Sequence, residues 1–157
     1  MRILEVEQRT EEWSLHRVGL FTASNFSKIV SSSGGRSKSL PDYAKEVASR
    51  ILSNVQDTPF MNESMQRGID LEAEALDAYQ ERTLSCVKTI GMMILDDLGY
   101  SPDGLVGDSG LIEIKCMNNI NHIKCINSGV VPSKYVPQIQ GGLYISGRDW
   151  CDFVCYN

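Results

Sequence analysis

The middle of the chain reads Ser101-Pro102-Asp103-Gly104 and then, after a turn at 107–110, Leu111-Ile112-Glu113-Ile114-Lys115-Cys116. Residues 111, 112 and 114 are good strand formers, and the Gly-Asp-Ser-Gly run before them favours a turn. Because side chains alternate along a strand, Glu113 and Lys115 share one face. The hairpin brings Asp103 alongside them. The stretch therefore predicts antiparallel strands that carry an acid on one strand and an acid and a lysine on the next.

This arrangement has a chemical consequence. Two converging carboxylates, Asp103 and Glu113, form a hard-oxygen site suited to Mg²⁺ or Mn²⁺. The Lys115 ammonium can orient a water molecule or stabilise charge that develops on a phosphorane. The pattern indicates metal-dependent hydrolysis of a phosphodiester. An Asp-Gly turn followed by an amphipathic strand with a surface Glu/Lys pair gives the same pattern, and the pattern alone leaves that alternative open.

Size and charge limit the class of protein. The chain has 157 residues, of which 42% are hydrophobic and 22% charged, as is ordinary for a globular domain with a core. We find no apolar run that approaches a membrane span, and the acidic N-terminus is unlike a signal peptide, so we expect a cytoplasmic protein with no membrane partner. The net charge of −5 argues against a protein that coats DNA non-specifically. It leaves room for acidic metal ligands beside a local basic groove.

The cysteines lie at positions 86, 116, 125, 151 and 155. Their odd number and the absence of C-x-x-C spacing favour reduced thiols in a cytoplasmic protein. The alternative is an iron–sulfur or zinc site, because Cys151 and Cys155 would point the same way on a strand. Two further ligands are not evident, so we expect no iron–sulfur cluster.

Hydrophobic periodicity and turn residues predict a mixed α/β fold, with a small twisted mixed sheet flanked by helices. The predicted helices span 22–30 with Thr22 as the cap, 41–54, 62–82, 118–127 and 133–145. The predicted strands span 86–95, 100–106 and 111–116, which we expect to be antiparallel, and 150–156. A flexible loop is expected at 31–39.

An acid interrupts the apolar stripe of the predicted helix at 62–82. Glu72 falls on the stripe that runs from Met65 to Tyr79, whereas Glu74 falls on the charged face. A buried carboxylate is costly unless it is paired or bound to a metal. Glu72 is therefore a candidate third acid near Asp103 and Glu113. Alternatively, it lies at the edge of the stripe and reaches solvent.

An amide makes a similar interruption in the helix at 133–145. Gln140 shares a stripe with Val136 and Leu143, and Gly141 and Gly142 lie beside it. Glycine inside a helix costs about 1 kcal/mol relative to alanine and is tolerable where another backbone approaches closely. Gln140 is either a satisfied core amide or a catalytic residue, and the pattern leaves both open.

Four segments in order resemble the phage lambda exonuclease and YqaJ-type viral recombinase family of the PD-(D/E)xK nuclease superfamily. The segments are Trp13–Gly19 with Thr22–Ser24, Arg67–Glu72, Ser101–Gly104 with Glu113–Lys115, and Tyr135–Gln140. The resemblance implies one nuclease domain with a restriction-endonuclease-like core over 1–157. Its helical part would span about 1–83 and its sheet-containing catalytic core about 84–157.

The resemblance also implies roles for individual residues in hydrolysis. Asp103, Glu113 and the carbonyl of Ile114 would bind Mg²⁺, for which Mn²⁺ can substitute. Glu72 would support a second metal or its waters. Lys115 would position the attacking water. Gln140 would help to hold water or substrate.

Other positions match the part of the family pattern that grips a DNA end. Arg17, Ser24 and Ser101 would bind the 5′-phosphate, for which the planar fork of an arginine is well suited. Met65 stands where the family places an apolar wedge that splits the terminal base pair. Members of the family usually continue beyond the strand expected at 150–156, whereas this sequence stops at Asn157.

The function implied is Mg²⁺-dependent 5′→3′ degradation of one strand of duplex DNA, which leaves a 3′ overhang for phage-type recombination. The expected partners are double-stranded DNA ends, a single-strand annealing protein and further copies of the chain in a trimeric ring. The location would be the cytoplasm of a bacterial host, as a phage or prophage protein. The rivals are an endonuclease, a Cas4-like exonuclease with a cluster, and a non-catalytic DNA-end-binding protein on the same fold.

Overall fold

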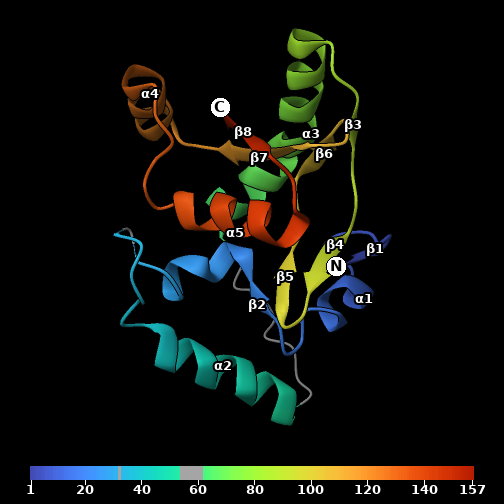
Figure 1. Cartoon of the computed structure of the whole chain (residues 1–157). Helices are drawn as coiled ribbons and strands as arrows, with labels where there is room; N and C mark the ends of the chain where they lie inside the picture. The colour runs from blue at the N-terminus through green and yellow to red at the C-terminus, as the bar shows by residue number, and fades with distance from the viewer. Residues whose placement is uncertain (32, 54–61) are drawn as a thin grey trace. The chain divides into compact units, whose positions relative to one another are not determined.

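The computed structural model describes residues 1–31, 33–53 and 62–157 (Figure 1). The chain forms two units, each assembled from separate stretches of the sequence. The first unit contains the described residues up to 53, Ile90–Pro102 and Ser133–Gly147. The second contains residues 62–89, Asp103–Pro132 and Arg148–Asn157. A single domain over 1–157 stays a prediction.

The first unit is built on a four-stranded mixed sheet with the order β1-β4-β5-β2. Its strands are β1 (Arg2–Leu4), β4 (Met92–Leu95), β5 (Leu98–Tyr100) and β2 (Phe21–Thr22). The inner strand β4 is antiparallel to β1 and to β5, while β2 runs parallel to β5. Tyr100, Met92 and Met93 are fully buried, so this sheet carries the core of the unit.

The helical elements of the first unit are α1 (Glu11–Leu15), the 3₁₀ helix η1 (Ala23–Lys28), α2 (Leu40–Ser53) and α5 (Val136–Ser146). Helix α5 packs on η1 and on β5 through its two glycines. A Cβ atom on Gly141 would lie 2.1 Å from the Phe26 ring, and one on Gly142 would lie 2.6 Å from the Tyr100 ring. The close approach expected at these glycines is confirmed, but aromatic rings make it and not a backbone.

The second unit holds the other four-stranded mixed sheet, in the order β3-β6-β7-β8. Its strands are β3 (Val87–Lys88), β6 (Gly104–Val106), β7 (Gly110–Cys116) and β8 (Trp150–Tyr156), and its helices are α3 (Glu63–Thr83) and α4 (Asn119–Ser128). Strand β7 is antiparallel to β6 and parallel to β8, with Glu113 opposite Phe153 and Lys115 opposite Cys155.

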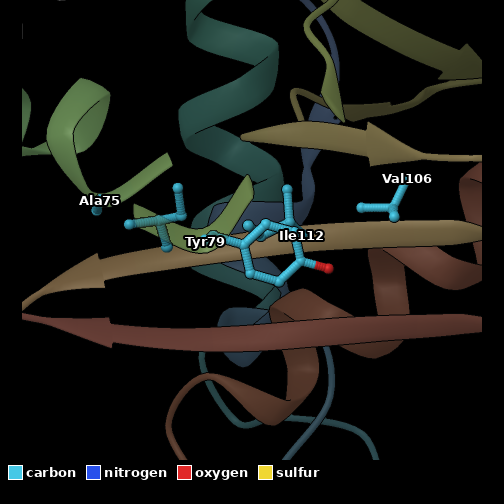
Figure 2. Packing of buried hydrophobic residues seen from close by; sticks show 5 residues of the cluster. Ala75, Tyr79, Val106 and Ile112 are labelled. Atoms are coloured by element: carbon cyan, nitrogen blue, oxygen red, sulfur yellow. The ribbon is translucent and has the colours of Figure 1, made fainter. Parts of the chain in front are cut away.

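Helix α3 covers one face of this sheet. Ala75 and Tyr79 of α3 join Val106, Ile112 and Ile114 in a buried apolar cluster, most of which is seen in Figure 2. The Tyr79 hydroxyl donates to Asp152 Oδ2 at 2.7 Å, which satisfies its polar end. Because Ile112 and Ile114 point towards α3, the alternation along β7 directs Glu113 and Lys115 to the other face of the sheet.

The mixed α/β fold class is confirmed, although the strands divide between two sheets. The strand predicted at 86–95 is two strands, β3 and β4, in different units. The strand predicted at 100–106 is likewise divided into β5 and β6 around Pro102, which lacks the N–H that a continuous ladder needs. Strands β6 and β7 are antiparallel as expected.

Most of the predicted helices are present with shifted ends. The segment predicted as a helix at 22–30 is a 3₁₀ helix preceded by the short strand β2, and Thr22 precedes it without a side-chain cap bond. Helix α5 starts later than predicted, with a proline in its first turn. Asn54, the predicted end of α2, and Ser32 in the predicted loop lie outside the described residues. In the described part of the chain, no helix is long and apolar enough to cross a membrane.

Two cysteines differ from the expectation. The structure pairs Cys125 of α4 with Cys155 of β8 in a disulfide. The prediction of five reduced thiols is therefore wrong at this pair, because the fold brings a helix after β7 against the end of β8. The sequence separation of 30 residues gave no sign of it. Cys86, Cys116 and Cys151 are free thiols.

Candidate active site

The central hairpin of the second unit places Asp103 beside the middle of β7. Asp103 stands immediately before β6, and its Oδ2 atom accepts a hydrogen bond from the Ile114 backbone N–H at 2.5 Å. The following Gly104 is required by space, because a Cβ atom there would lie 2.2 Å from a methyl carbon of Val87. The convergence predicted from the sequence pattern is thus present, and the turn between the strands holds Gly107 at a φ of +53°.

Glu113 and Lys115 form an ion pair on the strand next to Asp103. The Lys115 Nζ atom lies 2.5 Å from Glu113 Oε1. Glu113 is only 1% exposed, whereas the Lys115 side chain is 26% exposed. A buried glutamate needs a partner because the cost of removing its charge from water is large. The pair therefore keeps a carboxylate and an ammonium in place on one face of β7.

The raised pKa of Asp103 indicates that the acidic side chains lie close together. Burial, and then the negative charge of Glu113, raise the pKa of Asp103 to about 7. The Lys115 charge and the Ile114 N–H bond oppose this rise, while Glu72 adds to it. A cation bound between two carboxylates that repel each other in a buried site stabilises their ionised forms.

The residues fit a divalent metal by the chemistry of their donors. Asp103 and Glu113 offer hard carboxylate oxygens, which Mg²⁺ and Mn²⁺ prefer, and their mutual repulsion disfavours two charges without a cation. Among residues 1–31, 33–53 and 62–157, no group of three or more His, Cys, Asp or Glu side chains is already gathered as a metal cage. Mg²⁺ is commonly held by one or two carboxylates together with waters and substrate phosphates, so a pair of acids is sufficient.

Helix α3 packs on the face of the sheet opposite to Glu113 and Lys115, and it brings the charge of Glu72 near Asp103. Burial is the largest cause of the raised pKa of Asp103 and of Cys116, and the charge of the half-buried Glu72 adds to both, so Glu72 lies near the end of β7. Glu74 is exposed, and its Oε1 atom accepts a hydrogen bond from the Tyr156 hydroxyl at 2.7 Å. Glu72 is thus less exposed than Glu74, as helical phase predicted, and its role as a third acid stays a prediction.

Sequence reasoning missed one neighbour of these acids. Cys151 of β8 lies opposite Leu111, on the face of the sheet that carries Glu113. Burial, and then the charge of Glu113, raise the pKa of the Cys151 thiol to about 12. The thiol is therefore protonated at neutral pH in the metal-free protein, and as a soft ligand it is poorly suited to Mg²⁺. Only the parallel pairing of β8 with β7, which the sequence did not reveal, could have placed it here.

The first unit carries the three residues expected to bind a 5′-phosphate. Ser101 follows β5, and its Oγ atom accepts a hydrogen bond from the Trp13 indole N–H at 3.0 Å. The guanidinium carbon of Arg17 lies 4.2 Å from the centre of the Trp13 ring. Burial lowers the pKa of Arg17. The Tyr43 hydroxyl opposes this lowering and the Arg50 charge adds to it, so Tyr43 and Arg50 lie close to Arg17.

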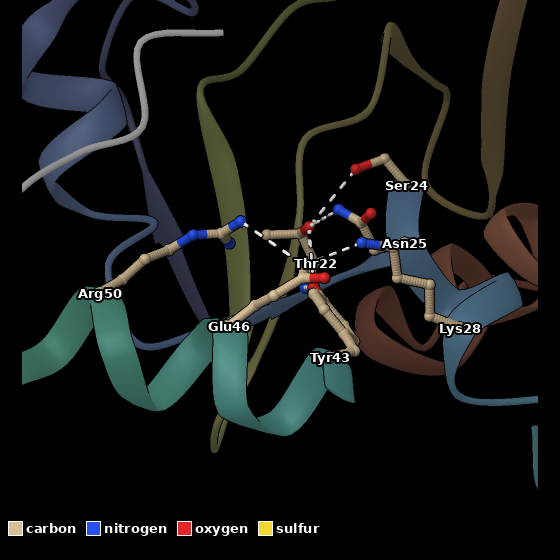
Figure 3. A network of polar contacts seen from close by, with 7 residues as sticks. All are labelled: Thr22, Ser24, Asn25, Lys28, Tyr43, Glu46 and Arg50. Atoms are coloured by element: carbon tan, nitrogen blue, oxygen red, sulfur yellow. Dashed lines mark hydrogen bonds and ion pairs between the residues drawn. The ribbon is translucent and has the colours of Figure 1, made fainter. Parts of the chain in front are cut away.

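Ser24 lies in a polar network on η1 and α2 that Figure 3 shows. Its Oγ atom is 3.3 Å from Thr22 Oγ1, and the Thr22 backbone N–H donates to the buried Tyr43 hydroxyl at 3.1 Å. Tyr43 also acts on the pKa of Arg17, so it lies near both Arg17 and the polar network that contains Ser24. Tyr43 is a second residue that the sequence pattern did not single out.

Two predicted residues have positions that differ from the simplest expectation. Gln140 is exposed on α5, whose buried face is formed by Ile139, Gly141, Gly142 and Ile145. The alternative in which Gln140 is a satisfied amide of the core is therefore wrong. The helix begins three residues later than predicted, and its glycines take the inward positions. Met65 is 46% exposed near the start of α3 and is available for contact with a ligand. A catalytic Gln140 and a wedge at Met65 both stay predictions.

A family model and three solved structures are similar to this chain. Residues 12–149 match the family model described as the YqaJ-like viral recombinase domain. The crystal structure of LHK-Exo, an alkaline exonuclease from Laribacter hongkongensis, is 39% identical with a TM-score of 0.84, over 94% of this chain and 74% of that chain. The structure of LHK-Exo in complex with dAMP is 38% identical, with the same TM-score and coverage.

A third structure is similar in fold alone. The phage related exonuclease from Haemophilus somnus 129PT is 18% identical with a TM-score of 0.62, over 87% of this chain and 68% of that chain. No curated protein matches the chain. The family match spans most of the sequence, includes both units and contains every residue predicted for the site. The chain belongs to the YqaJ-like viral recombinase family.

Proposed function

We propose that this chain is a Mg²⁺-dependent DNA exonuclease that removes nucleotides 5′→3′ from a duplex end and leaves a 3′ overhang. The family and the LHK-Exo relatives support the coarser part, a DNA exonuclease. The observation that carries the proposal is the convergence of Asp103, Glu113 and Lys115 on one hairpin, with two acids close enough to repel each other.

Asp103 and Glu113, with the carbonyl of Ile114, would hold the metal ion. A divalent ion supplies a nucleophilic water at neutral pH and stabilises negative charge on the phosphate oxygens. Lys115, held at Glu113, would donate to the attacking water and keep it in line with the phosphorus. Glu72 would accept hydrogen bonds from the waters around the site, because its charge is close enough to act on Asp103.

The direction of degradation would follow from recognition of the 5′-phosphate by Arg17, Ser24 and Ser101. An arginine binds phosphate oxygens through two parallel N–H groups, and serine hydroxyls add further donors. LHK-Exo has been crystallised with dAMP, a deoxynucleoside monophosphate. Stepwise hydrolysis from a 5′ end would release products of this kind.

The remaining roles are part of the same proposal. Met65 would separate the terminal base pair, and Gln140 would hold a water or the substrate. The 3′ strand would pass to a single-strand annealing protein, and copies of the chain would form a trimeric ring in the cytoplasm of a bacterial host. Sedimentation at high protein concentration tests the ring, and a monomer alone would remove that part.

The test uses linear duplexes labelled at each end, with and without a 5′-phosphate, in Mg²⁺ and in EDTA. We expect release of label from the 5′ end in Mg²⁺ only. Asp103→Asn should reduce the rate by about a hundredfold or more, because a metal ligand is lost. Asp108→Asn, at an exposed acid in the same hairpin turn, is the matched control and should retain the native rate.

Three outcomes would contradict the proposal. Cleavage of a closed circular duplex would favour an endonuclease. Iron and sulfide in the purified protein would favour a Cas4-like enzyme. Binding of duplex ends without any hydrolysis, in Mg²⁺ or in Mn²⁺, would favour a DNA-end-binding protein.

A further inference from the structure

Trp13 contacts two of the three residues proposed to bind the 5′-phosphate. It lies on the short helix α1, where the Thr10 side chain accepts a hydrogen bond from its backbone N–H at 3.2 Å. Its indole N–H is shared between the Gly91 carbonyl at 3.1 Å and Ser101 Oγ at 3.0 Å. Its ring supports the Arg17 guanidinium at 4.2 Å. All of these residues belong to the first unit.

The bond to Gly91 fixes the indole to the sheet. Gly91 directly precedes the inner strand β4, and its N–H donates to the Leu4 carbonyl of the neighbouring strand at 3.1 Å. A Cβ atom at Gly91 would lie 2.3 Å from the Val6 carbonyl oxygen, so two backbone segments are in close contact here. The hydrogen bond to the Gly91 carbonyl therefore ties the Trp13 ring to a closely packed edge of the sheet.

The two remaining contacts orient donors. The Arg17 guanidinium carbon lies over the face of the Trp13 ring at 4.2 Å, so the ring attracts the cation and holds its N–H donors at this place. Ser101 Oγ accepts the indole N–H, so the serine hydroxyl hydrogen must point to another acceptor. Both contacts hold hydrogen-bond donors of Arg17 and Ser101 beside the same indole.

We propose that Trp13 is the positioning residue that holds Arg17 and Ser101 as one binding unit for a terminal phosphate. This rests on the proposed function for the identity of the ligand. Trp13 acts through its neighbours and need not touch the phosphate. Its effect should therefore appear only where a phosphate is present, and should disappear once Arg17 and Ser101 have been removed.

The experiment measures binding of one duplex with a 5′-phosphate and of the same duplex with a 5′-hydroxyl, in EDTA, so that cleavage does not interfere. The readout is the ratio of the two dissociation constants. Native protein should prefer the phosphate. Trp13→Leu, which loses the stack and the N–H, should lower the ratio about tenfold, and Trp13→Phe, which keeps a ring, about threefold. Trp13→Leu in an Arg17→Ala, Ser101→Ala background should lower it no further.

The matched control is Trp150→Phe. Trp150 also donates its indole N–H to a serine, Ser109, at 3.2 Å, but it belongs to the second unit. This variant should keep the native ratio. If Trp13→Leu does not fold, as judged by thermal unfolding, Trp13→Phe decides the matter because it fills much of the same space.

The outcomes separate this inference from the proposed function. An unchanged ratio in the folded Trp13 variants, or equal weakening of both duplexes, overturns the positioning role. A native protein that cleaves DNA but has no preference for the phosphate also overturns it, while the nuclease stands. A native protein that prefers the phosphate through Trp13 and does not hydrolyse DNA supports the positioning role and removes the exonuclease.

Discussion

At the scale of single residues, the Asp103 carboxyl shows how the fold prepares a site for a cation. Burial and the charge of Glu113 raise its pKa to about 7, against the help of Lys115. An unfolded aspartate loses its proton near pH 4. Between these values the folded, metal-free protein keeps a proton that the unfolded chain releases. Without a metal ion, the ionised Asp103 carboxylate therefore destabilises the folded hairpin most at neutral pH and above, where a nuclease would work.

The sign of this linkage gives a prediction about stability. A carboxyl whose pKa is raised by folding stabilises the protein fully below pH 4, and this contribution is lost as the pH rises towards 7. In EDTA, we expect the free energy of unfolding of the native protein to fall from pH 4 to 7 by a few kcal/mol at most, compared with that of Asp103→Asn over the same range. Thermal unfolding from pH 4.5 to 8 measures it. Mg²⁺ at pH 8 should raise the native melting temperature and leave that of the variant nearly unchanged; parallel pH profiles would contradict the assignment.

How much of the site was predictable depends on how local each contact is. Asp103, Glu113 and Lys115 converge through a hairpin, so turn chemistry and strand alternation were sufficient. Cys151 approaches through the parallel pairing of β7 with β8, which connects strands distant in sequence. Trp13 approaches Ser101 across a separation of 88 residues. No periodic pattern encodes contacts of this kind, since they depend on the packing of whole elements.

At the scale of elements, α3 is placed by its apolar face. Ala75 and Tyr79 are buried against β7, and this contact fixes the rotation of the helix. Glu72 lies one turn before Ala75 and is half-buried, whereas Glu74 is exposed and accepts a hydrogen bond from the Tyr156 hydroxyl. The phase was predictable because the apolar and charged stripes are well separated.

We therefore expect Glu72→Gln and Glu74→Gln to differ. Loss of the Glu72 charge should slow hydrolysis about tenfold or more, because a group that orders water near the metal loses its charge. Glu74→Gln should retain the native rate, since glutamine can still accept the Tyr156 hydroxyl. Initial rates at saturating Mg²⁺ measure both, and equal effects would remove the argument from helical phase.

Helix α5 offers a prediction about packing. Gly141→Ala would place a methyl group 2.1 Å from the Phe26 ring and should destabilise the protein by about 1–3 kcal/mol. Gly68 of α3 is the matched control, because a Cβ atom there meets nothing within 4 Å. Gly68→Ala should stabilise by about 0.5–1 kcal/mol through the better helix propensity of alanine. Urea unfolding measures both, and equal signs would contradict the packing argument.

The boundaries of several elements were not predictable. The sequence predicts one strand over Val87–Lys88 and Met92–Leu95 because both segments favour extended backbone. In the structure they belong to different sheets. The short strands β1 and β2 contain three and two residues, too few for a period to register. They exist because Leu4 and Thr22 find partners in β4 and β5, which is a tertiary effect.

At the scale of the whole molecule, the predicted roles divide between the two units. Residues proposed for hydrolysis, Asp103, Glu113 and Lys115, belong to the second unit. Residues proposed for the terminal phosphate, Arg17 and Ser101, belong to the first. The chain enters the second unit between Pro102 and Asp103, so Ser101 and Asp103 are two residues apart in sequence and serve different units. The hydrolytic and end-reading functions should therefore be separable by mutation.

This separation predicts a particular pattern of rates on phosphorylated and unphosphorylated duplex ends. Lys115→Ala should slow both kinds of end by the same large factor, because every hydrolysis needs the oriented water. Arg17→Ala should slow phosphorylated ends roughly ten- to a hundredfold, the value of a charge-assisted bidentate contact, and should barely affect hydroxyl ends. On phosphorylated ends the two effects should multiply in the double variant, because groups that act independently contribute additive free energies. Single-turnover rates at saturating protein measure all four species. An Arg17→Ala variant that slows both ends equally would make Arg17 a general or structural cation, and a strongly non-multiplicative double variant would mean that the two groups of residues act as one.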